Sequence, residues 1–80
     1  MDQALLRSLF DRENVDPRCY SFGNTAPEER YSLERTYAGW SVYYDERGHR
    51  RDERTYEDLD AACRDMLERV LRDPTTRRRT

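Results

Sequence analysis

The clearest pattern in the chain is a helical repeat of apolar residues between Tyr56 and Arg72. The apolar positions that share one helical face are Leu59, Ala62, Cys63, Met66, Leu67, Val70 and Leu71. Thr55 is suited to cap the first turn, with Asp58 three residues later, and Pro74 ends the pattern. We therefore predict an amphipathic helix here, whose apolar face must pack against the rest of the chain.

A shorter apolar stripe near the N-terminus predicts another helix over residues 2–13, capped by Asp2. The apolar positions with helical spacing are Leu5, Leu6, Leu9 and Phe10. The segment 14–17 ends this helix, because Pro17 disfavours the helical conformation of the residue before it.

Between the helices, alternation of apolar and polar residues predicts four strands. We expect them at residues 19–22, 30–37, 40–44 and 49–55. The expected connections are a loop at 23–27, a tight turn at Ala38-Gly39 and a hairpin loop at 45–48. Gly48 suits a position with positive φ in that hairpin loop.

The strands differ in how apolar their faces are. The apolar-face positions are Tyr31, Leu33 and Tyr37 in the second strand, and Trp40, Val42 and Tyr44 in the third. The last strand, His49–Thr55, offers no apolar face, which is typical of a charged edge strand. A disordered connector is the alternative for this segment.

These elements predict a single small α+β domain in the order α-β-β-β-β-α, over residues 1–74. We expect an antiparallel sheet with both helices packed on one face. Residues 75–80 read as a basic, disordered tail.

Charge is abundant and unevenly distributed. Charged residues make up 40% of the chain, and all fifteen basic residues are arginines. Residues 1–76 carry twelve arginines and seventeen acids, a net of −5; Arg77, Arg78 and Arg79 bring the total to −2. An acidic body disfavours nucleic acid and anionic membranes as partners and suits a basic protein.

The sequence lacks the residue sets that carry catalysis. His49 is the only histidine, and the two cysteines, Cys19 and Cys63, form neither a disulfide framework nor a zinc motif. No glycine-rich phosphate loop occurs. We expect no enzyme activity, no cofactor and no metal. With neither a signal peptide nor a transmembrane segment in the chain, we expect a cytoplasmic protein.

Protein recognition is the function class that remains, since Tyr, Trp and Arg dominate binding energies at interfaces. Tyr43 is expected on the sheet face opposite Trp40, exposed among charged groups. The residues predicted to bind a partner are Tyr43, Asp45, Glu46, His49, Arg51, Asp52 and Glu53. A solvated sheet face without a partner is the alternative.

Two other functions stay open. The element order is similar to that of double-stranded-RNA-binding domains, but the start of the last helix carries Glu57, Asp58 and Asp60, where those domains place basic residues. A structural or regulatory module that self-associates through its edge strand is the second alternative; otherwise we expect a monomer when no partner is present.

Several segments carry a resemblance to a family. They are Tyr31-Ser32-Leu33-Glu34, Gly39-Trp40-Ser41-Val42-Tyr43-Tyr44-Asp45-Glu46-Arg47-Gly48, Ala62-Cys63-Arg64 and Leu71-Arg72-Asp73-Pro74-Thr75-Thr76-Arg77. With these the chain resembles small immunity proteins encoded beside bacterial polymorphic toxins, including toxins of the NAD-glycohydrolase type. The resemblance implies a stoichiometric cytoplasmic inhibitor that binds a cognate toxin domain and covers its active site. It transfers no catalytic residue.

Overall fold

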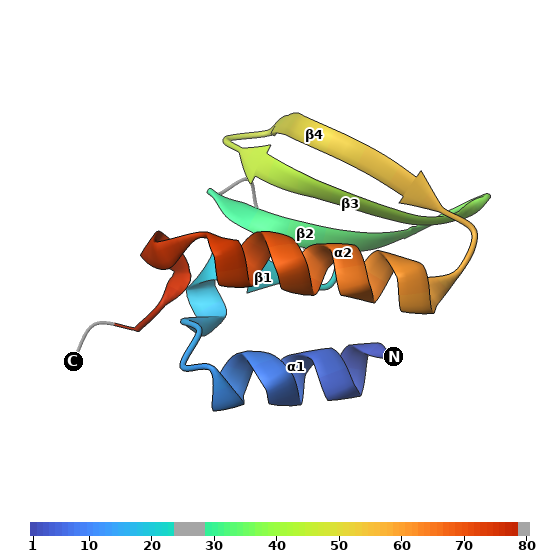
Figure 1. Ribbon diagram of the computed structural model, residues 1–80. Helices are drawn as coiled ribbons and strands as arrows, with labels where there is room; N and C mark the ends of the chain where they lie inside the picture. Colours follow the sequence, from blue (N-terminus) through green and yellow to red (C-terminus); the bar gives the residue numbers. More distant parts are fainter. Residues whose placement is uncertain (24–28, 79–80) are drawn as a thin grey trace.

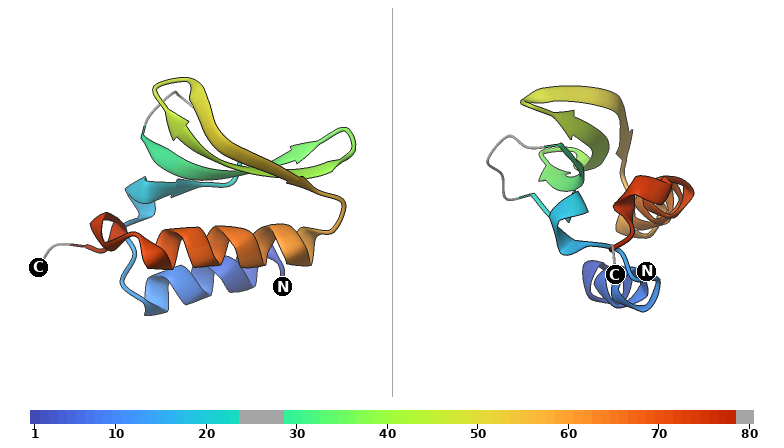
Figure 2. Two further views of the ribbon diagram at one scale, coloured as in Figure 1. Left: turned by 45° about the horizontal axis from the view of Figure 1, so that its top comes forward. Right: turned by 90° about the vertical axis from the view of Figure 1, so that its left-hand side faces the viewer.

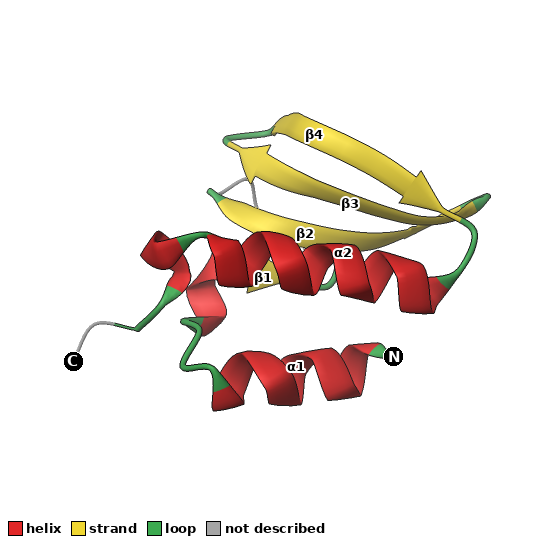
Figure 3. Ribbon diagram, in the orientation of Figure 1, coloured by secondary structure: helices red, strands yellow, loops and turns green. Residues whose placement is uncertain are grey.

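A computed structural model describes residues 1–23 and 29–78. The elements follow the order α1, β1, β2, β3, β4, α2, with two short 3-10 turns, η1 (Pro17–Cys19) and η2 (Pro74–Thr76) (Figures 1 and 3). The predicted α+β class and element order are confirmed. The predicted loop at 23–27 lies outside the described residues except for Gly23, which forms a bend.

Helix α1 spans Gln3–Arg12, and Asp2 caps it as predicted by accepting a hydrogen bond from the Leu5 amide at 2.8 Å. Leu6 and Phe10 are its buried residues. The Phe10 ring lies 4.7 Å from the ring of Tyr20, so α1 is held against the beginning of the sheet.

Helix α2 spans Leu59–Arg72 and begins later than predicted. Asp58 is the N-cap, accepting from the Asp60 amide, whereas Thr55 and Tyr56 belong to β4. Tyr56 pairs with Trp40 across the sheet, and this pairing keeps it in the extended conformation. The apolar face of α2 is as predicted, since its buried residues are Ala62, Cys63, Met66 and Val70.

The sheet has the order β1-β2-β3-β4 and is mixed, not antiparallel as predicted. β1 (Tyr20–Ser21) runs parallel to β2 (Arg30–Thr36), whereas β3 (Gly39–Glu46) and β4 (His49–Tyr56) each reverse direction. Only the last two connections are tight hairpins, and a tight hairpin forces antiparallel pairing. The predicted first strand is also shorter, because Cys19 belongs to η1.

The turn between β2 and β3 is formed by Tyr37 and Ala38, not by Ala38 and Gly39. Tyr37 therefore leaves the apolar face where we predicted it and is fully exposed, at 106% of its reference area. Gly39 has φ 148°, and a Cβ there would lie 2.2 Å from the carbonyl oxygen of Tyr56. The tip of the β2–β3 hairpin therefore lies directly against the backbone at the end of β4.

The core lies between the sheet and the two helices, which occupy the same side of it as predicted (Figures 1 and 2). Its fully buried members are Leu6, Phe10, Val15, Leu33, Val42, Ala62, Cys63, Met66 and Val70. β4 adds only Tyr56 to the residues packed against this cluster. Burial raises the pKa of the Cys63 thiol, which behaves as a small apolar group.

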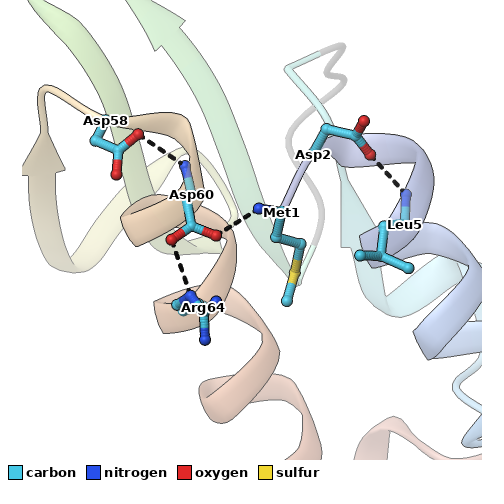
Figure 4. A network of polar contacts seen from close by, with 6 residues as sticks. All are labelled: Met1, Asp2, Leu5, Asp58, Asp60 and Arg64. Carbon is cyan, nitrogen blue, oxygen red and sulfur yellow. Dashed lines mark hydrogen bonds and ion pairs between the residues drawn. The ribbon is translucent and has the colours of Figure 1, made fainter.

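The two helices run in the same direction, with their N-termini at one end of the molecule (Figures 1 and 2). There the Met1 amino group forms an ion pair with Asp60, which also binds Arg64 at 2.9 Å (Figure 4). The amino group and Arg64 hold the pKa of Asp60 below its usual value. Asp2, Asp58 and Asp60 at this end complement the positive ends of both helix dipoles.

The C-terminal segment is more ordered than predicted. We expected a disordered tail from residue 75, but Thr76 is 2% exposed and its hydroxyl donates to the carbonyl of Val70 at 2.9 Å. Arg77 forms an isolated β-bridge with Val15. The uncapped carbonyls at the end of α2 attract these donors, so residues 75–78 pack onto the domain.

Candidate functional site

Strand β4 is an edge strand whose side chains are almost all in solvent. Of its eight residues, the first seven are exposed and only Tyr56 is half-buried. It nevertheless pairs with β3 along its length, so the predicted charged edge strand is confirmed and the disordered connector is not. Because β4 contributes so little to the core, its side chains are available for another role.

The turn that leads into β4 is built by Asp45, Arg47 and Gly48. Arg47 and Gly48 both have positive φ (53° and 91°), as the two central residues of a type I′ hairpin require. The Asp45 carboxylate accepts a hydrogen bond from the Gly48 amide at 2.8 Å and is 6% exposed. Asp45 therefore stabilises the turn and is not free to contact a partner.

A β-bulge in β4 decides which side chains face the helices. The register shifts between Val42 and Tyr44, and Asp52 takes up the extra length with φ 53°. Arg54 then pairs with Val42, and Arg51 pairs with Tyr44. Since Val42 points into the core, the bulge places both arginines on the helix side of the sheet.

On the opposite face Tyr43 is buried, at 5% exposure, and the prediction of an exposed tyrosine is wrong. Arg50 covers the ring and joins Glu34 (2.7 Å) and Glu53 (2.8 Å) by hydrogen bonds. The Tyr43 hydroxyl donates to Glu34 at 3.1 Å, and the Ser41 hydroxyl donates to Glu53 at 2.5 Å. Hydrogen bonds from Ser41 and Arg50 lower the pKa of Glu53, so this ionic cover is strongest with Glu53 ionised.

Between β4 and α2 lies an open groove of about 830 Å³. It is lined by Tyr31, Tyr44, Arg51, Asp52, Glu53, Arg54, Asp65, Glu68, Arg69, Arg72 and Asp73. The apolar face of α2 packs on β2 and β3, and the charged side chains of β4 and α2 line the groove beside this contact. We call it the β4–α2 groove.

Ion pairs and tyrosines organise the walls of this groove. Arg69 binds Asp65 through two nitrogens, at 2.9 and 3.1 Å, and both side chains are largely buried (15% and 16% exposed). Tyr31 donates to Asp73 at 2.9 Å, and burial followed by this hydrogen bond raises the pKa of Tyr31 to about 12. These hydrogen bonds tie four of the groove-lining side chains into pairs.

The outer charges of the groove are held less firmly. Arg51 pairs with Glu46 at 2.9 Å, with the two side chains 61% and 42% exposed. Arg72 pairs with Glu68 in a similarly exposed setting. Arg54 has no carboxylate partner among residues 1–23 and 29–78. Because exposed pairs contribute only about 0–1 kcal/mol, a partner can exchange them for its own groups.

The structure thus divides the predicted partner-binding residues into two groups. Glu46, His49, Arg51, Asp52 and Glu53 are all accessible on the β3–β4 hairpin, but the Glu53 carboxylate lies on the Tyr43 face of the sheet, where it binds Ser41 and Arg50. Tyr43 and Asp45 are excluded from the accessible group by burial.

Sequence reasoning missed Arg54 and the groove-facing stripe of α2. That stripe consists of Asp65, Glu68, Arg69 and Arg72. The i, i+3, i+4, i+7 spacing of these residues was visible in the sequence as one face of the helix. This stripe could not be assigned to a site from the sequence, because helical spacing does not show which strand lies opposite the helix face.

Tyr37 lies on the surface, although we predicted it on the apolar face of the sheet. Tyr37 and Leu5 are the large apolar residues with the greatest exposure in the described part of the chain. Beside Tyr37, the Arg35 guanidinium lies 5.7 Å from the centroid of the half-buried Trp40 ring. Tyrosine, tryptophan and arginine are the residues most enriched at the energetic centres of interfaces, so this hairpin tip is a surface feature apart from the β4–α2 groove.

Comparison of the chain with protein-family models, curated proteins and solved structures gave no match. Within residues 1–23 and 29–78, no three His, Cys, Asp or Glu side chains are grouped to hold a metal ion. No described helix has the length and apolar character needed to cross a bilayer. The geometry of the surface is therefore what supports a function.

Proposed function

We propose that this domain is a protein-binding inhibitor whose contact surface is β4 together with the β4–α2 groove. The observation that carries the proposal is that β4 pairs with β3 on both sides of the bulge yet exposes seven of its eight side chains, all polar or charged. A strand that adds almost nothing to the core is best explained if its side chains contact another molecule. The groove gives a partner a concave surface to enter.

The specific form of the proposal is an immunity protein that inhibits a cognate bacterial toxin domain in the cytoplasm. It rests on the family resemblance of the sequence and on charge. The net charge of −2 favours a basic partner, and opposite charge accelerates association through electrostatic steering. In this proposal the β3–β4 hairpin covers the toxin active site, and no catalytic residue of the domain takes part.

Within this surface the residues have different roles. Glu46, His49, Arg51, Asp52 and Arg54 provide exposed charges and hydrogen-bonding groups for the partner. Glu53 is exposed, but it is also part of the ionic cover over Tyr43. Tyr43 and Asp45 act indirectly, because they hold the strand and its turn in shape.

The experiment begins with affinity purification of the domain from its source cells. The tag belongs at the C-terminus, since the Met1 amino group is engaged by Asp60. We expect one near-stoichiometric protein to survive a high-salt wash and to lose its toxic or enzymatic activity when the domain is added. Recovery of nucleic acid alone, released as salt rises, would instead support the RNA-binding alternative.

Variants then locate the contact surface. Glu46→Arg/Glu68→Arg reverses two exposed acidic residues, one on the hairpin and one in the groove, and we expect at least about a tenfold loss of affinity for a basic captured protein. The control is Asp11→Arg/Glu13→Arg, which makes the same change of charge on exposed positions at the end of α1, away from β4. Equal affinities for both double variants would remove the groove from the interface.

A further inference from the structure

Both helices finish at the end of the molecule opposite the N-terminus (Figure 1). A smaller hollow of about 330 Å³ is lined by residues at that end. It is lined by Asp16, Arg18, Thr75, Arg77 and Arg78. Three arginines against one aspartate give this lining a net charge of +2, although the whole chain carries −2. A local excess of positive charge in an acidic protein needs an explanation.

The hollow is formed where the C-terminal segment joins the connection after α1. The Asp16 amide donates to the carbonyl of Thr76, and the Arg78 amide donates to the carbonyl of Asn14, each at 2.8 Å. Between these bonds Val15, which is 1% exposed, pairs with Arg77. The backbone on both sides of the hollow is therefore fixed, and the arginines are gathered by the fold.

The three guanidiniums are only partly neutralised. Arg18 pairs with Asp16 at 3.0 Å while its side chain remains 88% exposed. Arg78 pairs with Asp11 at 3.2 Å, where Asp11 is 73% exposed. Such exposed pairs exchange readily with another anion.

Arg77 differs from the other two. Its guanidinium donates to the Thr76 hydroxyl at 3.1 Å and to the Leu71 carbonyl at 3.3 Å. Both acceptors are neutral, and no carboxylate of the described residues pairs with it. Arg77 is also only half-exposed, so its charge is less screened by water than those of its neighbours.

We propose that this hollow binds a phosphate group. Guanidinium groups match phosphate oxygens with paired, charge-assisted hydrogen bonds, and three of them suit a group with several acceptor oxygens and a charge near −2. A single carboxylate would use fewer of these donors. The proposal is independent of the protein-binding surface, because none of the five lining residues belongs to β4 or the β4–α2 groove.

The test is a titration of the isotope-labelled domain with inorganic phosphate, followed by NMR of backbone amides and arginine side chains. Sodium chloride at matched ionic strength serves as the reference. We expect saturable shifts confined to residues 16–18 and 75–78, with a dissociation constant on the order of 1 mM. A parallel titration with adenosine monophosphate separates the sources: tighter binding identifies a nucleotide phosphate, and equal binding identifies free phosphate.

Three variants sharpen the test. Arg18→Gln should weaken phosphate binding about tenfold, as expected for the loss of charge-assisted hydrogen bonds. Asp16→Asn should strengthen it about threefold, because the competing negative charge is removed while an oxygen remains to accept from the Arg18 amide. Arg64→Gln, which removes an exposed paired arginine at the other end, should leave binding unchanged.

The proposal is overturned if chloride reproduces the shifts, if the shifts do not saturate, or if Arg18→Gln binds phosphate as tightly as Arg64→Gln does. Arg18 is exposed, and within residues 1–23 and 29–78 its one ion-pair partner is Asp16, so its variant is expected to fold. Loss of binding in Arg18→Gln is therefore not explained by unfolding, and the unchanged amide spectrum of the rest of the domain checks this directly.

Discussion

The guanidinium of Arg50 lies over the ring of Tyr43, 4.3 Å from the ring centroid, on the sheet face that carries no helix. An aromatic residue on an uncovered face would ordinarily be exposed. Here a charged side chain of the edge strand shields it, and two carboxylates hold that side chain in place. The long apolar stem of an arginine makes such a cover effective.

This arrangement predicts that Arg50→Ala destabilises the domain by about 2 kcal/mol, because it uncovers Tyr43 and leaves Glu34 and Glu53 without their shared donor. Urea unfolding at neutral pH measures the loss. The matched control is Arg51→Ala, the next residue, whose exposed pair with Glu46 should contribute less than about 0.5 kcal/mol. Similar losses for the two variants would contradict the role assigned to Arg50.

Gly39 gives a second prediction. Because a Cβ would lie 2.2 Å from the Tyr56 carbonyl oxygen and φ is 148°, Gly39→Ala should cost more than about 3 kcal/mol or prevent folding. Gly48→Ala introduces positive-φ strain in a turn, and we expect it to cost about 1 kcal/mol. Thermal unfolding compares the variants, and equal losses would show that the contact with Tyr56 is unimportant.

The raised pKa of Tyr31 predicts a dependence of stability on alkaline pH. In the folded domain burial and the hydrogen bond to Asp73 raise the pKa to about 12, above the value near 10 of an unfolded chain. The stability that this group contributes is therefore fully present below pH 10 and is lost as pH rises towards 12. Urea unfolding across this range should show a steeper decline for the native sequence than for Tyr31→Phe, and parallel curves would contradict the assignment.

The ion pair between Met1 and Asp60 predicts that the N-terminus is sensitive to extension. Adding two residues before Met1 moves the amino group away from Asp60 and should lower the thermal midpoint. Asp60→Asn should lower it as well, and combining both changes should add little, since they remove the same contact. Additive losses would show that the extension acts elsewhere, and the same two residues added after Thr80 provide the control.

The periodicity of the sequence was enough to predict both helices and most of their buried faces; Leu5, expected on the apolar stripe of α1, is 49% exposed. Met66 and Val70 are buried because every turn of α2 repeats the same apolar position. The start of α2 was misplaced because Thr55 and Asp58 are both good caps. The choice between them is made by pairing of Tyr56 with Trp40, a contact between residues that local sequence does not connect.

The candidate site was predictable only in part, for the same reason. The charged character of β4 identified it as an exposed edge strand. The burial of Tyr43, however, depends on Glu34, Arg50 and Glu53 meeting across three strands. Alternation of polar and apolar residues assigns a face to a side chain but does not show whether charged neighbours will cover it.

The edge position of β4 leads to a final prediction, that the isolated domain is a monomer with the chain mass of 9.7 kDa. Its charged side chains and the bulge at Asp52 both oppose pairing with another strand. Replacing Arg51 and Arg54 by valine removes two of these charges, and we expect that variant to self-associate. Sedimentation equilibrium of both proteins checks this, with Arg7→Val/Arg12→Val on α1 as the control for added apolar surface. A dimer of the native sequence would instead favour self-association through the edge strand as the function of β4.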